Sequence, residues 1–209
     1  MSMETRSRTV ACLLVADYDL LAVAGFAQAL AACGRQWNWR PFRLQLARLQ
    51  GGPLRSSCGL SLEPTVAASE VASPEILMVG GGYGVRQLAN EPQQLELLRR
   101  HAVRARCVVG IGGGLLLLAL AGCLGARRIS APPNLQRELS EIEPTLSIEN
   151  ARVLADDEWI SCASSAWSLE AGLEVIRVLL GEGLANQTAS ALGMSGPVLP
   201  FPSRGVTIR

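Results

Sequence analysis

The chain lacks lysine, and its 209 residues include one histidine and few aromatic side chains. All 19 basic residues are arginine, and 18 acidic residues leave a formal net charge of +1. Because a surface that binds nucleic acid needs an excess of positive charge, we do not expect this chain itself to bind DNA. The absence of lysine fits a GC-rich coding bias, although arginine also favours bidentate contacts with carboxylates.

Long apolar runs and paired metal-binding cysteines are also missing. The apolar run at residues 115–120 is far shorter than the roughly 20 residues of a membrane span. The first apolar run contains Asp17 and Asp19, so the N-terminus does not resemble a signal peptide. The six cysteines form no CxxC pair and have no neighbouring histidine. We therefore expect a cytoplasmic protein with reduced thiols, no metal site, no cofactor and no membrane partner.

Short apolar strands alternate with helical segments along most of the chain. This alternation predicts an α/β fold with a doubly wound, mostly parallel sheet flanked by helices. The spacing of apolar residues predicts strands at residues 9–15, 42–49, 55–62, 75–79, 106–111, 129–131, 145–148, 152–154 and 159–162. It predicts helices at residues 20–32, 114–124, 134–142, 164–180 and 184–192, and one that holds both Leu88 and Leu98.

The composition divides the chain into three parts. Residues 1–8 are polar, and we expect them to be disordered, whereas residues 9–192 form one α/β domain. Residues 193–209 are rich in glycine and proline, which is typical of a linker. A linker in this place predicts that a further domain follows it in the full-length protein.

Two glycine-rich turns, at residues 80–82 and 112–114, each follow a predicted strand. Ligands of doubly wound folds bind outside the carboxyl ends of the strands. Many α/β enzymes hold a nucleophile at such a turn, but the second turn consists of three glycines. Glycine accepts a positive φ there, so the turn keeps its shape without a reactive group. Its backbone amides suit an anion, or the glycines serve only the strand-to-helix turn.

Three segments of the chain resemble the ThiJ/PfpI superfamily, which has a flavodoxin-like, class I glutamine amidotransferase-like fold. The first, residues 112–128, combines the glycine turn, an apolar stretch and an arginine pair. The second, residues 78–84, is a glycine turn after a central strand, and the third, residues 156–173, is a hairpin followed by small residues and a long helix. More narrowly, the chain is similar to the N-terminal sensor domain of AraC-family transcriptional regulators.

This resemblance implies that three catalytic positions are replaced. The family cysteine falls on Gly112, the family histidine on Pro132, and the acidic residue of the first helix near Ala22. The single histidine, His101, is expected on the surface of a polar helix. Because a nucleophilic mechanism needs a thiol or hydroxyl with a base in reach, we expect no enzymatic activity.

The expected ligand site gathers the two glycine turns and the start of the last long helix. The ring of Trp167 suits a protonated or quaternary amine, or it fills the pocket as core. Tyr83 either lines the pocket or packs against its neighbours. The resemblance implies an amino acid or amine-like effector. The predicted ligand-binding residues are Gly81, Gly82, Tyr83, Gly112, Gly113, Ser164, Ser165 and Trp167.

Three functions stay open from the sequence. The first is a non-catalytic sensing and dimerisation domain of an AraC-family regulator, which contacts DNA as a homodimer only through a C-terminal domain beyond this chain. The second is a ThiJ/PfpI-type hydrolase, amidase or isonitrile hydratase-like enzyme whose nucleophile has moved to Cys107 or Cys162. The third is a free-standing protein that only dimerises.

Overall fold

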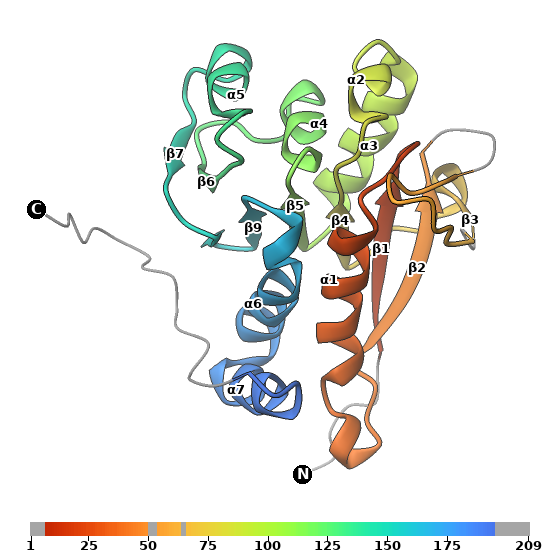
Figure 1. Cartoon of the computed structure of the whole chain (residues 1–209), viewed down its shortest axis with the longest axis vertical. Coiled ribbons are helices and arrows are strands. Elements are labelled where there is room, and N and C mark those ends of the chain that lie inside the picture. The colour runs from red at the N-terminus through yellow and green to blue at the C-terminus, as the bar shows by residue number, and fades with distance from the viewer. Residues whose placement is uncertain (1–6, 50–53, 64–65, 195–209) are drawn as a thin grey trace, which may run out of the picture.

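A central parallel sheet organises the molecule in the computed structural model (Figure 1), which describes residues 7–49, 54–63 and 66–194. Within these residues seven strands pair in the order β3-β2-β1-β4-β5-β9-β8. All neighbours are parallel except β8 and β9, so the predicted mostly parallel sheet is confirmed. The strands are β1 (Arg8–Leu14), β2 (Phe42–Arg48), β3 (Val66–Ala67), β4 (Ile76–Val79), β5 (Cys107–Ile111), β8 (Val153–Asp156) and β9 (Trp159–Cys162).

Helices cover both faces of this sheet. On one face α1 and α6 pack side by side, with α7 beside α6 (Figure 1). On the other face α4 contacts α2, α3 and α5, as expected when right-handed crossovers run in both directions from the first strand. The helices are α1 (Leu20–Ala32), α2 (Val85–Leu88), α3 (Pro92–Arg104), α4 (Gly114–Leu120), α5 (Gln136–Ile142), α6 (Ser168–Leu180) and α7 (Glu182–Ala191). A small sheet of β6 (Arg128–Ser130) and β7 (Ser147–Glu149) adjoins β8.

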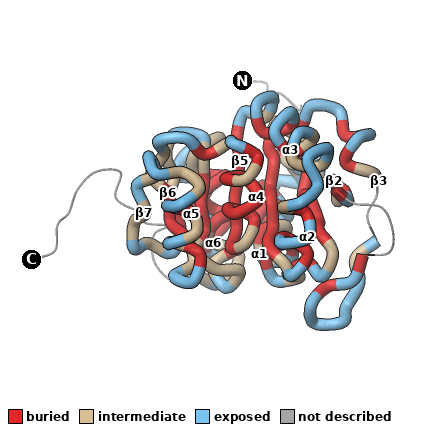
Figure 2. Tube along the Cα trace, turned by 90° about the horizontal axis from the view of Figure 1, so that it is seen from above, coloured by how far each residue is buried: buried red, intermediate tan, exposed pale blue. Residues whose placement is uncertain are grey.

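The core lies around β4, β5 and α4, which Figure 2 shows in red. Every residue of β4 and β5 is buried, because helices cover both faces of these strands. This explains why both strands are continuous apolar runs rather than alternating ones. Among the described residues, no helix is both long and apolar enough to span a membrane.

The close packing of α1 against α6 depends on glycine. A Cβ placed on Gly172 would lie 2.6 Å from the Cβ of Ala29 and 2.9 Å from the carbonyl oxygen of Phe26. Ser168 donates a hydrogen bond to the carbonyl oxygen of Leu21 at 2.8 Å, which joins the first turns of the two helices. The contact therefore brings the start of α1 next to the start of α6.

Two predicted elements differ from the structure. Residues 54–63 form a loop rather than a strand, because Tyr18 holds them: its hydroxyl accepts a hydrogen bond from the Leu62 amide at 2.6 Å. The predicted single helix around Leu88 and Leu98 is two helices. Pro92 begins the second one, at a position where its missing N–H is not needed.

The predicted surface position of His101 is also wrong. Only 5% of this residue is exposed, and its Nε2 lies 2.9 Å from the carbonyl oxygen of Ala68. The 3₁₀ turn Ala68–Glu70, which directly follows the edge strand β3, contacts α3 through this hydrogen bond. Such a contact is set by tertiary packing, and the polar pattern of α3 does not indicate it.

The predicted chain ends lie mostly outside the described residues. Of the segment 1–8, which we expected to be disordered, Arg8 already belongs to β1, and its amide donates to the carbonyl oxygen of Pro41 at 2.7 Å. Of the linker predicted at 193–209, only Gly193 and Met194 are described, and α7 ends shortly before them.

A matched pair of glycine substitutions tests the helix contact. We expect Gly172→Ala to lower the free energy of unfolding by about 1–3 kcal/mol, because the new methyl group overlaps α1. Gly183→Ala in α7 meets nothing within 4 Å and should raise this free energy by up to about 1 kcal/mol. Urea unfolding of both variants is the measurement. Equal effects would contradict the proposed contact.

Candidate functional site

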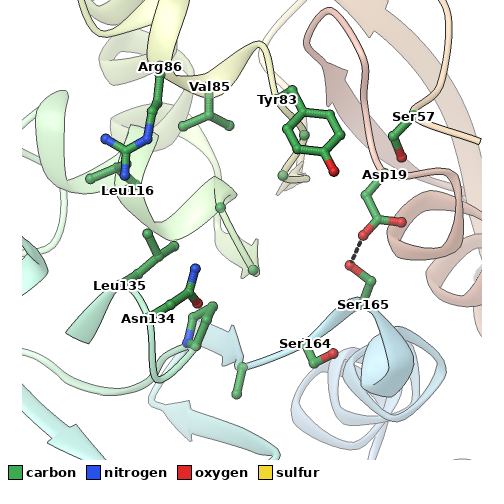
Figure 3. Close-up of a pocket in the computed structure, with 16 residues that line it drawn as sticks. Asp19, Ser57, Tyr83, Val85, Arg86, Leu116, Asn134, Leu135, Ser164 and Ser165 are labelled. Atoms are coloured by element: carbon green, nitrogen blue, oxygen red, sulfur yellow. Dashed lines mark hydrogen bonds between the residues drawn. The ribbon is translucent and has the colours of Figure 1, made fainter.

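A cavity of about 480 Å³ opens at the carboxyl ends of β1, β4, β5 and β9 (Figure 3). The chain runs from β1 to β2 on one side and later returns to β4 on the other, so this is the crevice where such folds bind ligands. Seven of the eight predicted ligand-binding residues line it: Gly81, Gly82, Tyr83, Gly112, Gly113, Ser164 and Ser165. Pro132, at the predicted histidine position, also lines it.

The turn at Gly112 has the predicted left-handed backbone, with φ of +56°. A Cβ placed there would have Ser165 Oγ as its nearest neighbour, at 3.9 Å. The pocket therefore has room above Gly112 for the start of a side chain. The Gly112 amide donates to the carbonyl oxygen of Cys162 at 2.9 Å, so this N–H is not available to a ligand.

The other turn is held by backbone-to-backbone packing. A Cβ placed on Gly81 would lie 2.7 Å from the amide nitrogen of Gly113, so the two glycine turns touch. Gly82 has φ of +155°, and a Cβ there would lie 2.5 Å from the carbonyl oxygen of Asp17. The next residue, Tyr83, is 79% exposed and lies at the edge of the pocket (Figure 3).

Asp19 provides a carboxylate that the sequence pattern indicates only as a turn or cap residue. Its Oδ1 accepts the Leu21 amide at 3.1 Å and caps α1, while its Oδ2 accepts a hydrogen bond from the hydroxyl of Ser165. Ala22, the predicted acidic position, is fully buried and does not line the pocket. The acidic residue at this site is therefore Asp19, about one helical turn earlier.

The Asp19 carboxylate lacks a basic partner within the described segments, where no arginine or histidine lies within ion-pair distance of it. It is a half-buried residue with two hydrogen bonds, and its negative charge faces the cavity (Figure 3). A cation in the cavity would offset the cost of keeping that charge partly away from water.

The opposite wall combines an arginine with apolar residues. Arg86 from α2 forms a bidentate pair with Glu138 from α5, with nitrogen-to-oxygen distances of 3.0 and 2.9 Å. Asn134 adds an amide on this side of the cavity (Figure 3). The apolar surface of the wall comes from Val85, Leu116 and Leu135. The sequence analysis missed these residues, because they come from separate elements and form no motif.

The predicted role of Trp167 as a platform for a cationic ligand is wrong. Trp167 does not line the cavity, and the guanidinium of Arg152 lies over its ring at 4.0 Å from the centroid. Arg152 also lies 3.7 Å from the carboxylate of Glu170 on α6. The protein's own cation therefore takes the place predicted for a ligand.

The two cysteines considered as relocated nucleophiles are poorly suited to that role. Cys107 and Cys162 are fully buried, and burial raises the pKa of both thiols to about 12. The Cys162 thiol donates to the carbonyl oxygen of Ser164 at 3.0 Å. Among the described residues that line the cavity there is no cysteine and no histidine, and no group of side chains could hold a metal.

The chain belongs to the DJ-1/PfpI family. The family model matches residues 9–178, which include both glycine turns and the whole main sheet except Arg8. This confirms the predicted ThiJ/PfpI resemblance and the α/β fold.

Two curated relatives have different functions. The chain is 28% identical over 153 residues to an isonitrile hydratase of Pseudomonas putida, covering 72% of this chain and 65% of the relative. It is 24% identical over 177 residues to the HTH-type transcriptional regulator CdhR of Pseudomonas aeruginosa, covering 85% and 52%. The chain thus spans less than two thirds of the length of either curated relative.

Two solved structures share the fold. A ThiJ/PfpI family protein from Pseudomonas syringae superposes with a TM-score of 0.81 at 18% identity, covering 97% of this chain and 80% of the other. An AraC family transcriptional regulator from Pseudomonas putida superposes with a TM-score of 0.75 at 24% identity, covering 88% and 99%. The structural neighbours of this chain therefore include a regulator.

Proposed function

We propose that this chain is the non-catalytic, ligand-sensing and dimerisation domain of an AraC-family transcriptional regulator. The observation that carries the proposal is the open pocket above Gly112, which retains the shape of a nucleophile site without a thiol. The buried thiols of Cys107 and Cys162 argue against a relocated nucleophile. The likeness to CdhR and to a solved AraC family regulator supports a regulatory role.

The effector is an amino acid or amine-like metabolite that places its cationic group at Asp19. The Asp19 carboxylate carries a charge that no basic side chain of the described segments pairs, and Ser165 holds it in place. Charged hydrogen bonds of this kind are among the stronger ones in proteins. This site replaces the aromatic platform predicted at Trp167.

DNA is contacted through a second domain. With a net charge of +1, the present chain has little excess positive charge with which to bind a duplex. A helix-turn-helix domain after residue 209 would bind DNA, and a homodimer would present two such domains to two half-sites. A protein of this kind acts in the cytoplasm.

An amine screen tests the ligand site. A protonated amine that binds the native state should raise the midpoint of thermal unfolding by roughly 5–10 °C when its concentration is about a hundred times its Kd. Asp19→Asn should abolish this shift while α1 keeps its cap, because asparagine caps helices as well as aspartate does. Differential scanning fluorimetry is the measurement.

Asp157→Asn is the matched control for this variant. Asp157 lies in the exposed turn between β8 and β9, with φ of +55°, which asparagine also tolerates. It should leave the shift unchanged. An amine-induced shift that survives Asp19→Asn would contradict the assigned site.

The regulatory role also makes a prediction about the gene. The reading frame should continue past Arg209 into a pair of helix-turn-helix motifs, because the sensor needs a domain that contacts DNA. Sequencing the gene beyond this codon is the test. A stop codon at that point would contradict the regulator, and turnover of isonitriles or amides that thiol alkylation abolishes would contradict the non-catalytic role.

A further inference from the structure

A second charged side chain faces Asp19 across the pocket. Figure 3 shows the Arg86 guanidinium on one wall and the Asp19 carboxylate on the other, with the apolar side chains of Val85 and Leu116 beside Arg86. Asn134, which lies on the same side as Arg86, adds amide donors and an acceptor. The pocket therefore has an unpaired carboxylate at one end, an arginine paired with a glutamate at the other, and an apolar surface on part of its wall.

Glu138 orients the guanidinium of Arg86 but occupies only part of its hydrogen-bond donors. Nη1 and Nη2 of Arg86 donate to the two oxygens of Glu138, and no other side-chain hydrogen bond of Arg86 is present among the described residues. A guanidinium has five N–H donors, so the Nε edge stays available. The Arg86 side chain is 68% exposed and that of Glu138 is 34% exposed, so a ligand can reach this edge.

The ion pair between Arg86 and Glu138 contributes little to the free energy of folding, and its main effect is to orient the guanidinium. Exposed ion pairs typically contribute less than about 1 kcal/mol to folding. Arg99 and Glu96 form such a pair within α3, three residues apart. Arg86 and Glu138 instead join α2 to α5 across 52 residues of chain, and Arg86 itself lines the cavity. A fixed guanidinium in a pocket is suited to bind a planar anion such as a carboxylate.

We propose that Arg86 is a specificity-determining residue that binds a carboxylate of the effector, while Asp19 binds its cationic group. The effector is then a zwitterion whose two charges are separated by a short apolar chain, because the two charged side chains lie on opposite walls. Glu138 is a positioning residue, since it holds the guanidinium without contacting the ligand. This inference rests on the proposed sensor function and adds a requirement for a carboxylate.

Pairs of probes that differ in the carboxylate test the inference. γ-Aminobutyrate, δ-aminovalerate and ε-aminocaproate are titrated by calorimetry alongside butylamine, pentylamine and hexylamine. The tightest amino acid should bind at least about tenfold more tightly than the tightest amine, as one charged hydrogen-bond pair would give. In Arg86→Gln this preference should fall to about twofold or less.

Two control variants test whether the preference depends on the Arg86 guanidinium itself. Arg99→Gln removes a comparable exposed arginine outside the pocket and should keep the tenfold preference. Glu138→Gln frees the guanidinium but retains it, so the preference for amino acids should persist, in contrast to Arg86→Gln.

The outcomes distinguish this inference from the proposed function. Equal binding of amines and amino acids to the wild type, or a preference that survives Arg86→Gln, overturns the role of Arg86. If those amines still lose affinity in Asp19→Asn, the proposed cation site stands. Absence of binding by both series overturns the zwitterion and the cation site together.

Discussion

The contact between the two glycine turns is the constraint on which the pocket depends. Gly81 lies against the backbone of Gly113, and a Cβ on Gly114 would overlap the carbonyl oxygen of Val79. No larger residue fits at Gly81 or Gly114 without a shift of the backbone. The turns that follow the neighbouring strands β4 and β5 therefore pack against each other and together form the floor of the pocket. Gly112 differs, because the space above it is open. The glycine at that position removes a side chain from the pocket rather than permitting close packing.

The polar side chains of the pocket are brought together by the packing of helices that are far apart in the sequence. Ser165 and Asp19 are 146 residues apart, yet they hydrogen bond because α6 packs directly on α1. Arg86 and Glu138 meet in the same way from α2 and α5. One wall thus carries an unpaired carboxylate and the other an arginine–glutamate pair, both held by the α/β frame. The relatives of this chain include both an isonitrile hydratase and a regulator, and one fold can serve either chemistry or binding.

Much of the fold could be predicted from the sequence, because buried parallel strands are continuous apolar runs and glycine turns mark their carboxyl ends. The same rule placed Gly81 and Gly112 at one site, whereas Ser165 was placed there by the family resemblance. The prediction for Trp167 failed because Arg152, from a separate strand region, covers its ring. The place of Asp19 in the pocket was missed, because capping residues and pocket residues look alike in a sequence. The pairing of Arg86 with Glu138 and the burial of His101 could not be predicted, because neither corresponds to a local pattern in the sequence.

The most direct test of the account is a structure of the protein bound to an amine that stabilises it. The account predicts that the ligand lies over Gly112, with its nitrogen within hydrogen-bond distance of the Asp19 carboxylate and with every cysteine unmodified. A ligand bound at another site, or one covalently attached to a cysteine, would contradict the claim that this pocket binds without reacting.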